Sequence, residues 1–387
     1  MLSASRDPSR PEGDADVVLV GIAARALAAC ARRAGLRAIT LDLFADEDTR
    51  ALAQKAVRLR RRGGLCIDPD HLLEQLSHHA GRDIPVVLGS GFDDAPDLVA
   101  QIETRFRLAG SGARTIVRLK HPFDFATRLA ELGIPHPRVF SGPAPQGLPM
   151  LEKRRGGSGG GHIRPALRAR GADWYLQERI EGRCMSALFL GDGRAARLLA
   201  FSEQWCDPAP HAPFRYGGCA GPVQPERTLA GEVAEALSRL TRAVELRGLA
   251  SADLVVTPDG WRLIEINPRP GATLDILDAA PLPPLLRLHL DACAGALPDL
   301  PLPVAGAGAQ VRAAGIVYAP AALVTGPDAL PDWAADRPGP GTHVAAGEPV
   351  CTVCATGSDV SQARAALARR MNHLRRGLST ASRAAAE

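Results

Sequence analysis

The sequence predicts a mixed protein, α/β at its N-terminal end and α+β beyond it, with two or three domains. Three observations predict this class. Short apolar strands alternate with helices early in the chain, antiparallel hairpins follow in its middle part, and a length of 387 residues allows a sizeable core. Hydrophobic residues make up 46% of the chain and charged residues 23%, as in ordinary globular proteins.

A Rossmann-like domain is expected over residues 16–112, after a polar leader at 1–15 that we expect to be disordered. It is indicated by strands and helices that alternate across short glycine turns, at residues 17–21, 23–34, 37–44 and 84–88. This order is typical of a parallel sheet covered by helices. The GxGxxG fingerprint is absent, so we do not expect a dinucleotide site there.

The second domain is expected over residues 113–295. Its predicted elements are a helix, an antiparallel strand pair, a long amphipathic helix and a hairpin, at residues 122–132, 184–205, 231–247 and 252–267. A small β-rich module with a terminal helix should follow at 300–376, and a disordered tail at 377–387. The pair Cys351 and Cys354 lacks the second CxxC that a zinc site needs, so we interpret both as strand residues.

The charge pattern excludes several kinds of partner. A net charge of +4 is small for this length, and aromatic residues make up only 4%, so no nucleic-acid surface is expected. No apolar run approaches membrane-spanning length. The eight cysteines show no disulfide pattern, which indicates a cytoplasmic protein.

The predicted hairpin carries acids where a buried strand would be apolar. Side chains alternate along a strand, so Glu265 and Asn267 share a face, and pairing places Asp253 opposite Ile264 or, with one residue of slippage, opposite Glu265. Two carboxylates and an amide oxygen suit Mg²⁺ (or Mn²⁺), which also keeps water and phosphate ligands. Arg269 would add a forked cation beside the metal. The alternative is a half-solvated hairpin whose acids pair with arginines.

Other features fit a bound polyphosphate. Lys153 enters a glycine-rich loop whose backbone N–H groups can fold over phosphates, formed by Gly156, Gly157, Ser158, Gly159, Gly160 and Gly161. A flexible linker is the alternative for that loop. The segment 175–182, YLQERIEG, could offer its edge backbone to adenine, or be an ordinary strand end. Lys120, which we place at the opening of a helix, is either a phosphate ligand or a surface lysine.

Taken in order, these motifs resemble the ATP-grasp superfamily over about residues 120–275. The resemblance rests on Lys120 with GIPHP, Lys153 with GGSGGG, YLQERIEG, Asp253, and the run EINPR that ends at Arg269. The fold it implies is an ATP-grasp domain between an N-terminal Rossmann-like (pre-ATP-grasp) domain and a C-terminal β-rich module. Within the superfamily, the runs GSGFD (89–93), QERIEG, EINPRPGATLD and DRPGPGTHVAAGEPVCTVCATG resemble the predicted carboligases related to biotin carboxylase. That group includes tyramine–glutamate ligase.

The resemblance implies roles for the nucleotide-binding residues. Lys120 and Lys153 would bind the phosphates of ATP, and the loop 156–161 would close over them. Gln177 would face the adenine amino group, beside an adenine hinge formed by Glu178, Arg179 and Ile180. Many members carry an acidic ribose-binding residue where this chain has Cys184, so either Glu181 takes that role or the contact is lost.

The resemblance also implies a metal site and a reaction. One or two Mg²⁺ would be held by Asp253, Glu265 and Asn267, and Arg269 would steady the transferred phosphoryl group. The implied activity is an ADP-forming carboxylate–amine ligase that works through an acyl phosphate, with glutamate and tyramine as expected substrates in methanofuran-type cofactor synthesis. Homodimers are common in this family.

Three alternative functions remain open: an ATP-grasp phosphotransferase, a biotin-carboxylase-like carboxylase, and a non-catalytic nucleotide-binding module. Substrates would be recognised by the N-terminal domain and by residues 206–222. The candidates there are His211, Arg215 and Tyr216, for which structural roles are the alternative. Arg183 and Arg215, with Arg269, could also cradle an amino-acid carboxylate, although a surface position is the alternative for the first two.

Overall fold

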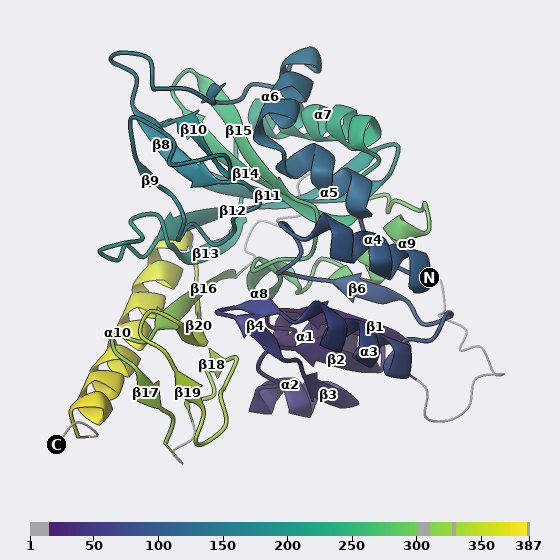
Figure 1. The fold of residues 1–387 in the computed structure, drawn as a ribbon, viewed down its shortest axis with the longest axis vertical. Helices are drawn as coiled ribbons and strands as arrows, with labels where there is room; N and C mark the ends of the chain where they lie inside the picture. The colour runs from purple at the N-terminus through teal and green to yellow at the C-terminus, as the bar shows by residue number, and fades with distance from the viewer. Residues whose placement is uncertain (1–14, 301–309, 327–329, 385–387) are drawn as a thin grey trace.

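The computed structural model describes residues 15–300, 310–326 and 330–384, so the leader expected at 1–15 lies almost entirely outside the described residues. Figure 1 shows three regions: a small parallel sheet from the N-terminal part, a small antiparallel sheet, and a long antiparallel sheet beside helix α10. None of the described helices is both long enough and apolar enough to cross a membrane.

The N-terminal region forms the parallel sheet that the strand–helix alternation predicts. Its strand order is β3-β2-β1-β6, with β1 Val17–Gly21, β2 Ala38–Asp42, β3 Lys55–Arg58 and β6 Val86–Leu88. The connections contain helices and one short hairpin: α1 Arg25–Arg33, α2 Glu47–Leu52, β4 Arg61–Gly63, β5 Cys66–Ile67, α3 Pro69–His79 and α4 Pro96–Arg105. The Rossmann-like fold of this region is therefore confirmed.

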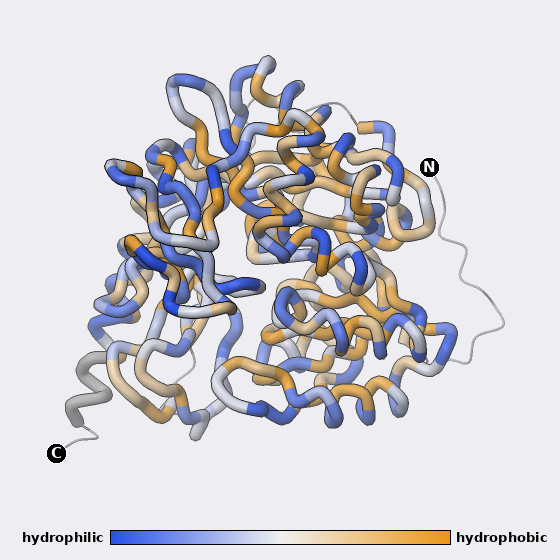
Figure 2. Tube along the Cα trace, turned by 45° about the horizontal axis from the view of Figure 1, so that its top comes forward, coloured by the Kyte–Doolittle hydropathy of each residue, from blue (hydrophilic) through white to orange (hydrophobic). Residues whose placement is uncertain are grey.

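Strand β1 shows why the sheet is covered on both faces. All five of its residues are buried, and alternation sends Val17 and Leu19 into one apolar cluster and Val18 and Val20 into another. The first cluster also contains Leu285 of the second domain. Figure 2 shows hydrophobic segments mainly in the interior of the molecule and hydrophilic segments mainly at its periphery.

A small antiparallel sheet and two helices follow. The helices are α5 Ala113–Lys120 and α6 Pro122–Glu131. The strands run in the order β7-β10-β8-β9, with β7 Val139–Phe140, β8 Met150–Arg154, β9 Arg164–Pro165 and β10 Trp174–Glu178. The glycine-rich loop connects β8 to β9.

The large sheet has the order β15-β14-β11-β12-β13-β16-β20-β18. Its first five strands come from the second domain: β11 Arg183–Asp192, β12 Ala196–Cys206, β13 Tyr216–Val223, β14 Arg247–Thr257 and β15 Gly260–Asn267. Three helices accompany them: α7 Arg227–Val244, α8 Leu274–Leu277 and α9 Leu285–Cys293. Helix α7 ends before the predicted 247, because Glu245 adopts a left-handed conformation with φ 59° and Leu246 then leads into β14.

The C-terminal strands extend this same sheet. They are β16 Val311–Tyr318, β18 Ala334–Ala335 and β20 Pro349–Gly357, with a separate pair of β17 Leu323–Val324 and β19 His343–Val344. Helix α10, Val360–Ala384, packs on β16 and β20 and continues past the boundary expected at 376. Cys351 and Cys354 lie in β20, and all eight cysteines are free thiols.

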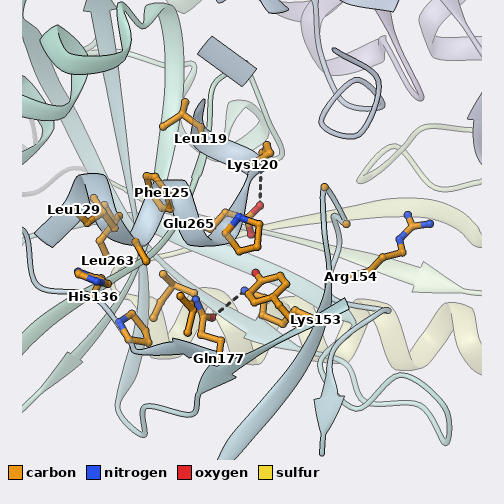
Figure 3. A pocket seen from close by; sticks show the side chains of 18 of the residues that line it. Leu119, Lys120, Phe125, Leu129, His136, Lys153, Arg154, Gln177, Leu263 and Glu265 are labelled. Atoms are coloured by element: carbon orange, nitrogen blue, oxygen red, sulfur yellow. Dashed lines mark hydrogen bonds and ion pairs between the residues drawn. The ribbon is translucent and has the colours of Figure 1, made fainter. Parts of the chain in front are cut away.

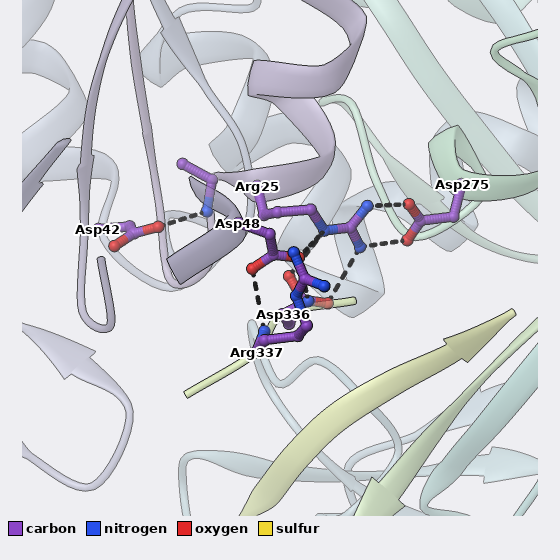
Figure 4. A network of polar contacts seen from close by, with 7 residues as sticks. Arg25, Asp42, Asp48, Asp275, Asp336 and Arg337 are labelled. Atoms are coloured by element: carbon purple, nitrogen blue, oxygen red, sulfur yellow. Dashed lines mark hydrogen bonds and ion pairs between the residues drawn. The ribbon is translucent and has the colours of Figure 1, made fainter. Parts of the chain in front are cut away.

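One buried arginine joins the N-terminal region, helix α8 of the second domain and the C-terminal region (Figure 4). Arg25 of α1 makes a bidentate pair with Asp275 of α8 and a second with Asp336, whose two oxygens lie 3.0 Å from Arg25 Nε and Nη2. Asp48 of α2 accepts the backbone N–H groups of Asp336 (2.8 Å) and Arg337 (2.9 Å). A buried arginine that pairs with carboxylates from two other elements fixes the relative placement of the elements that carry them.

Candidate functional site

A pocket of about 520 Å³, measured to its open mouth, lies between the small sheet and β15 (Figure 3). Its apolar wall includes Phe125, Leu129, Val139 and Leu263. The polar side chains that line it are Lys120, His136, Lys153, Arg154, His162, Tyr175, Gln177 and Glu265. Apolar walls with a few converging polar groups are typical of a small-molecule site.

The β14–β15 hairpin brings the proposed metal ligands together. Val256 pairs with Trp261, and a bulge after Asp253 then sets Asp253 opposite Glu265, which is the slipped register of the two considered. Asn267 lies at the end of β15, and its Nδ2 donates to Asp253 Oδ2 over 3.2 Å.

Lys120 is the last residue of α5, not the first residue of a helix as the sequence suggested. A cation is favourable at a helix C-terminus, and here the side chain turns inward to three oxygens. Its Nζ lies 2.5 Å from Glu265 Oε1, 3.1 Å from Asn267 Oδ1 and 3.3 Å from Asp93 Oδ1. Burial by itself would lower the pKa of Lys120, but the charges of Glu265 and Asp93 outweigh it and raise that pKa. The lysine is therefore not a free surface group.

The donor set fits Mg²⁺. Burial, followed by the charge of Glu265, raises the pKa of Asp253 to about 6. Burial would also raise the pKa of Glu265, but Lys120 and Lys153 hold it below its usual value. Two half-buried carboxylates that face each other favour a nearby cation, and in this structure Lys120 supplies it.

An ion here would have few protein ligands. Across residues 15–300, 310–326 and 330–384, no group of three or more His, Cys, Asp or Glu is placed to hold a metal. Mg²⁺ at this hairpin would accordingly take two carboxylates and one amide, and complete its octahedron with water or phosphate oxygens.

Lys153 reaches the pocket from the small sheet. It is 4% exposed, and its Nζ donates to Gln177 Oε1 over 3.1 Å (Figure 3). Antiparallel pairing of β8 and β10 sets Lys153 opposite Tyr175, whose side chain also lines the pocket. Lys120 and Lys153 thus line the same pocket from a helix end and from the small sheet.

The glycine-rich loop makes defined contacts. The Tyr216 N–H donates to Gly159 O over 2.8 Å. Gly160 has φ 73°, and a Cβ there would stand 1.9 Å from the carbonyl oxygen of Phe214. Both the positive φ and the close approach require glycine at this position. The loop therefore lies closed against the segment that precedes β13.

The expected adenine hinge is partly engaged by the protein's own backbone. The N–H groups of Glu178 and Arg179 donate to Arg138 O and Pro149 O, both over 2.8 Å. The carboxylate of Glu178 pairs with Arg138, and Glu181 pairs with Arg179 at the surface. Cys184 lies exposed near the start of β11.

The segment expected to recognise substrates uses its charged residues internally. Arg215 Nη2 lies 2.9 Å from Asp207 Oδ2, and its guanidinium stacks 3.8 Å from the centre of the Tyr318 ring. The Tyr318 hydroxyl donates to Tyr216 O over 2.7 Å. Arg183 pairs with Glu203 over 3.6 Å. These contacts favour structural roles for Arg183, Arg215 and Tyr216.

Two residues at the site are not among those predicted from the sequence. Asp93 Oδ2 accepts a hydrogen bond from Arg269 Nε over 3.0 Å. His162 follows the glycine-rich loop and lines the pocket, where burial and the charge of Lys153 lower its pKa to about 4 and leave it neutral. Asp93 stands just after the carboxyl end of β6, the edge at which parallel sheets bind ligands, and that position was the available signal.

Comparison with known proteins identifies the fold. Residues 122–273 match the sequence family described as the ATP-grasp domain. No curated protein sequence matches the chain. The chain has the ATP-grasp fold, since solved structures of that architecture superpose on nearly all of it.

Three of these structures show the extent of the similarity. Biotin carboxylase from Campylobacter jejuni, in a β-γ-ATP complex, is 12% identical with a TM-score of 0.66, over 90% of this chain and 89% of that one. N5-carboxyaminoimidazole synthetase from Staphylococcus aureus, complexed with ADP, is 14% identical with a TM-score of 0.66, over 92% and 97%. The biotin carboxylase domain of Hydrogenobacter thermophilus 2-oxoglutarate carboxylase, with MgADP, ADP and bicarbonate, is 13% identical with a TM-score of 0.66, over 91% and 89%.

Proposed function

We propose that this protein is an ATP- and Mg²⁺-dependent, ADP-forming ligase that activates a carboxylate and joins it to an amine. The observation that carries the proposal is the convergence of Lys120, Lys153 and Arg269 on the carboxylates and amide at the end of the β14–β15 hairpin. Cations around a pair of acids suit a nucleotide polyphosphate with its metal. Two of the structures of similar fold are complexes with ADP, which supports a nucleotide as the ligand.

Each group of residues in the site would have a distinct role. Asp253, Glu265 and Asn267 would hold Mg²⁺, which supplies charge neutralisation to the phosphates when bound. Lys120 and Lys153 would bind the phosphates, and Arg269 would stabilise the phosphoryl group in transfer. The loop 156–161 would exclude water from the activated acid.

The reaction has two steps. A carboxylate oxygen of the substrate attacks the γ-phosphorus of ATP while the bond to the bridging oxygen of ADP breaks, which gives an acyl phosphate. The amine nitrogen then attacks the acyl carbon, inorganic phosphate leaves, and the nitrogen loses a proton. Most of the acceleration would come from positioning and charge neutralisation. We propose glutamate as the acid and tyramine or a related amine as its partner, in the synthesis of a methanofuran-type cofactor.

The test is a screen of the purified protein for phosphate release from ATP, with amino acids crossed against amines. A ligase releases phosphate only when one acid and one amine are both present. Amide product must appear in equal amount, as measured by mass spectrometry. Phosphate release that never depends on an amine would contradict the ligase assignment.

A carboxylase is the second candidate, because two of the three structures compared are biotin carboxylases or their domains. Bicarbonate is then the acid, and phosphate release should require bicarbonate and a nucleophile but no amino acid. Adding bicarbonate alone and in pairs to the same screen separates the two reactions. A phosphotransferase would instead form a phosphorylated product without free phosphate.

A further inference from the structure

The N-terminal domain places one carboxylate inside the phosphate site. Asp93 is 6% exposed and follows β6 in the turn Gly89–Asp94. Its Oδ1 lies 3.3 Å from Lys120 Nζ and its Oδ2 lies 3.0 Å from Arg269 Nε. Burial would raise the pKa of Asp93, but Arg269 and Lys120 lower it to about 2, so this carboxylate is charged at any physiological pH.

The same turn touches the glycine-rich loop. A Cβ on Gly156, which has φ 64°, would stand 2.7 Å from Asp94 Cβ and 3.2 Å from Asp93 O. Arg154, at the end of β8, lies 3.5 Å from Asp94 Oδ2 at the surface. The turn therefore contacts three elements of the proposed phosphate site: the end of α5, the loop after β15 and the glycine-rich loop.

The position of this turn is fixed by packing. Val17 and Leu19 of the parallel sheet share an apolar cluster with Leu274 and Leu285, which lie beyond the Arg269 loop. A close-packed cluster transmits position, so Asp93 stands at a set place relative to Arg269 before any ligand binds.

Asp93 lies outside the lining of the nucleotide pocket. Lys120 and Glu265 line that pocket, whereas Asp93 and Arg269 line a second pocket of about 350 Å³, measured to its open mouth, with Leu108 and Ile116. Lys120 lines the nucleotide pocket and its Nζ lies 3.3 Å from Asp93 Oδ1, so this cation screens bound phosphates from the charge of Asp93. Without Asp93, both cations would be drawn toward Glu265 and Asp253, the proposed metal ligands.

We propose that Asp93 is a positioning residue of the phosphate site, which aims Arg269 and Lys120 at the transferring phosphoryl group and keeps them off the metal carboxylates. This inference rests on the proposed binding of Mg²⁺ and ATP. The N-terminal domain would then contribute a residue that orients the cations of the phosphate site.

The test compares Asp93→Asn with Asp97→Asn, a change of equal charge at an exposed position in the first turn of α4. For each variant, titration calorimetry measures the affinity for a non-hydrolysable ATP analogue and for ADP, both with Mg²⁺. Since Arg269 acts on the terminal phosphate, Asp93→Asn should lower the ratio of the two affinities about tenfold. Asp97→Asn should leave the ratio unchanged. A fraction of misfolded protein would reduce the binding of both nucleotides equally. The ratio of the two affinities therefore reports only on the position of Arg269.

A double-mutant cycle gives the second measurement. If Asp93 acts through Arg269, adding Asp93→Asn to Arg269→Met should change the ratio by less than about twofold. An unchanged ratio in Asp93→Asn, or full additivity in the cycle, overturns the inference while the proposed function stands. Failure of the wild-type protein to bind either nucleotide overturns both.

Discussion

At the scale of single residues, charge compensation determines how each acid of the site behaves. Glu265 pairs with Lys120 and keeps a pKa below its usual value, whereas Asp253 faces Glu265 without a cation of its own and has its pKa raised to about 6. Removing one partner of a buried pair costs far more than an exposed pair contributes. Substitutions in this site should therefore act strongly, and isosteric ones are the most informative.

Replacing Glu265 by Gln keeps its shape and removes one charge from the proposed metal site. We expect ATP-dependent phosphate release to fall at least about a hundredfold, because charge stabilisation in the transition state is lost. The matched control is Glu235→Gln on the exposed face of α7, which should keep wild-type turnover. Steady-state phosphate assays check this, with thermal unfolding to confirm the fold. Full activity in Glu265→Gln would remove Glu265 from the metal site.

Asp46 predicts a pH dependence of stability. Burial, followed by the charges of Asp336, Asp42 and Asp48, raises its pKa to about 8, and Arg25 only partly offsets this. The pKa of Asp46 is therefore higher in the folded protein than in the unfolded chain. The folded protein favours the neutral carboxyl group, so this contribution to stability is present at low pH and is lost as pH rises through about 8. Its side chain makes no capping bond to α2, so Asn loses no contact there.

We expect Asp46→Asn to raise the free energy of unfolding by on the order of 2 kcal/mol at pH 9 and to change it little at pH 4. Urea denaturation at the two pH values measures this difference. An equal effect at both would show that Asp46 titrates normally.

At the scale of elements, backbone conformation places the site. The bulge after Asp253 brings Glu265 opposite it, and the alternation of β1 covers both faces of the parallel sheet. The glycine-rich loop docks on the segment before β13 through Gly159 and Gly160. Of these features, the docked loop depends on a position, Gly160, that other residue types cannot fill without strain.

Gly160→Ala tests the docking of that loop. The added Cβ meets the Phe214 carbonyl oxygen, and alanine at φ 73° is strained, so the closed loop should lose about 1–3 kcal/mol. Nucleotide affinity should fall accordingly in calorimetry. Gly171→Ala is the control, since its Cβ meets nothing within 4 Å. Equal affinities in the two variants would mean that loop closure does not contribute to binding.

At the scale of the whole molecule, the three regions form one structure. Strands from the C-terminal region complete the large sheet, and one apolar cluster runs from the parallel sheet into the second domain. Arg25, whose side chain is 8% exposed, forms ion pairs with both Asp275 and Asp336. The relative position of the regions is thus set by both packing and charge.

Arg25→Leu should destabilise the whole molecule by about 3–5 kcal/mol, because two buried carboxylates lose their cation. Arg37→Leu is the comparison: Arg37 pairs with Asp16 where both side chains are partly exposed, and we expect a loss below about 1 kcal/mol. Chemical denaturation measures both. Similar losses would show that the junction at Arg25 contributes no more than a surface pair.

The sequence by itself determined what depends on neighbouring residues. The period of apolar residues predicted the parallel sheet and the β14–β15 hairpin, and the order of Lys120, Lys153, Asp253 and Arg269 predicted the ATP-grasp fold, which the comparisons confirm. Tertiary structure alone decided that strands after 310 join the large sheet, and that Asp93 contacts Arg269 across 176 residues of chain. Pairing and ion contacts at such separations depend on loop closure and packing, and no local pattern encodes them.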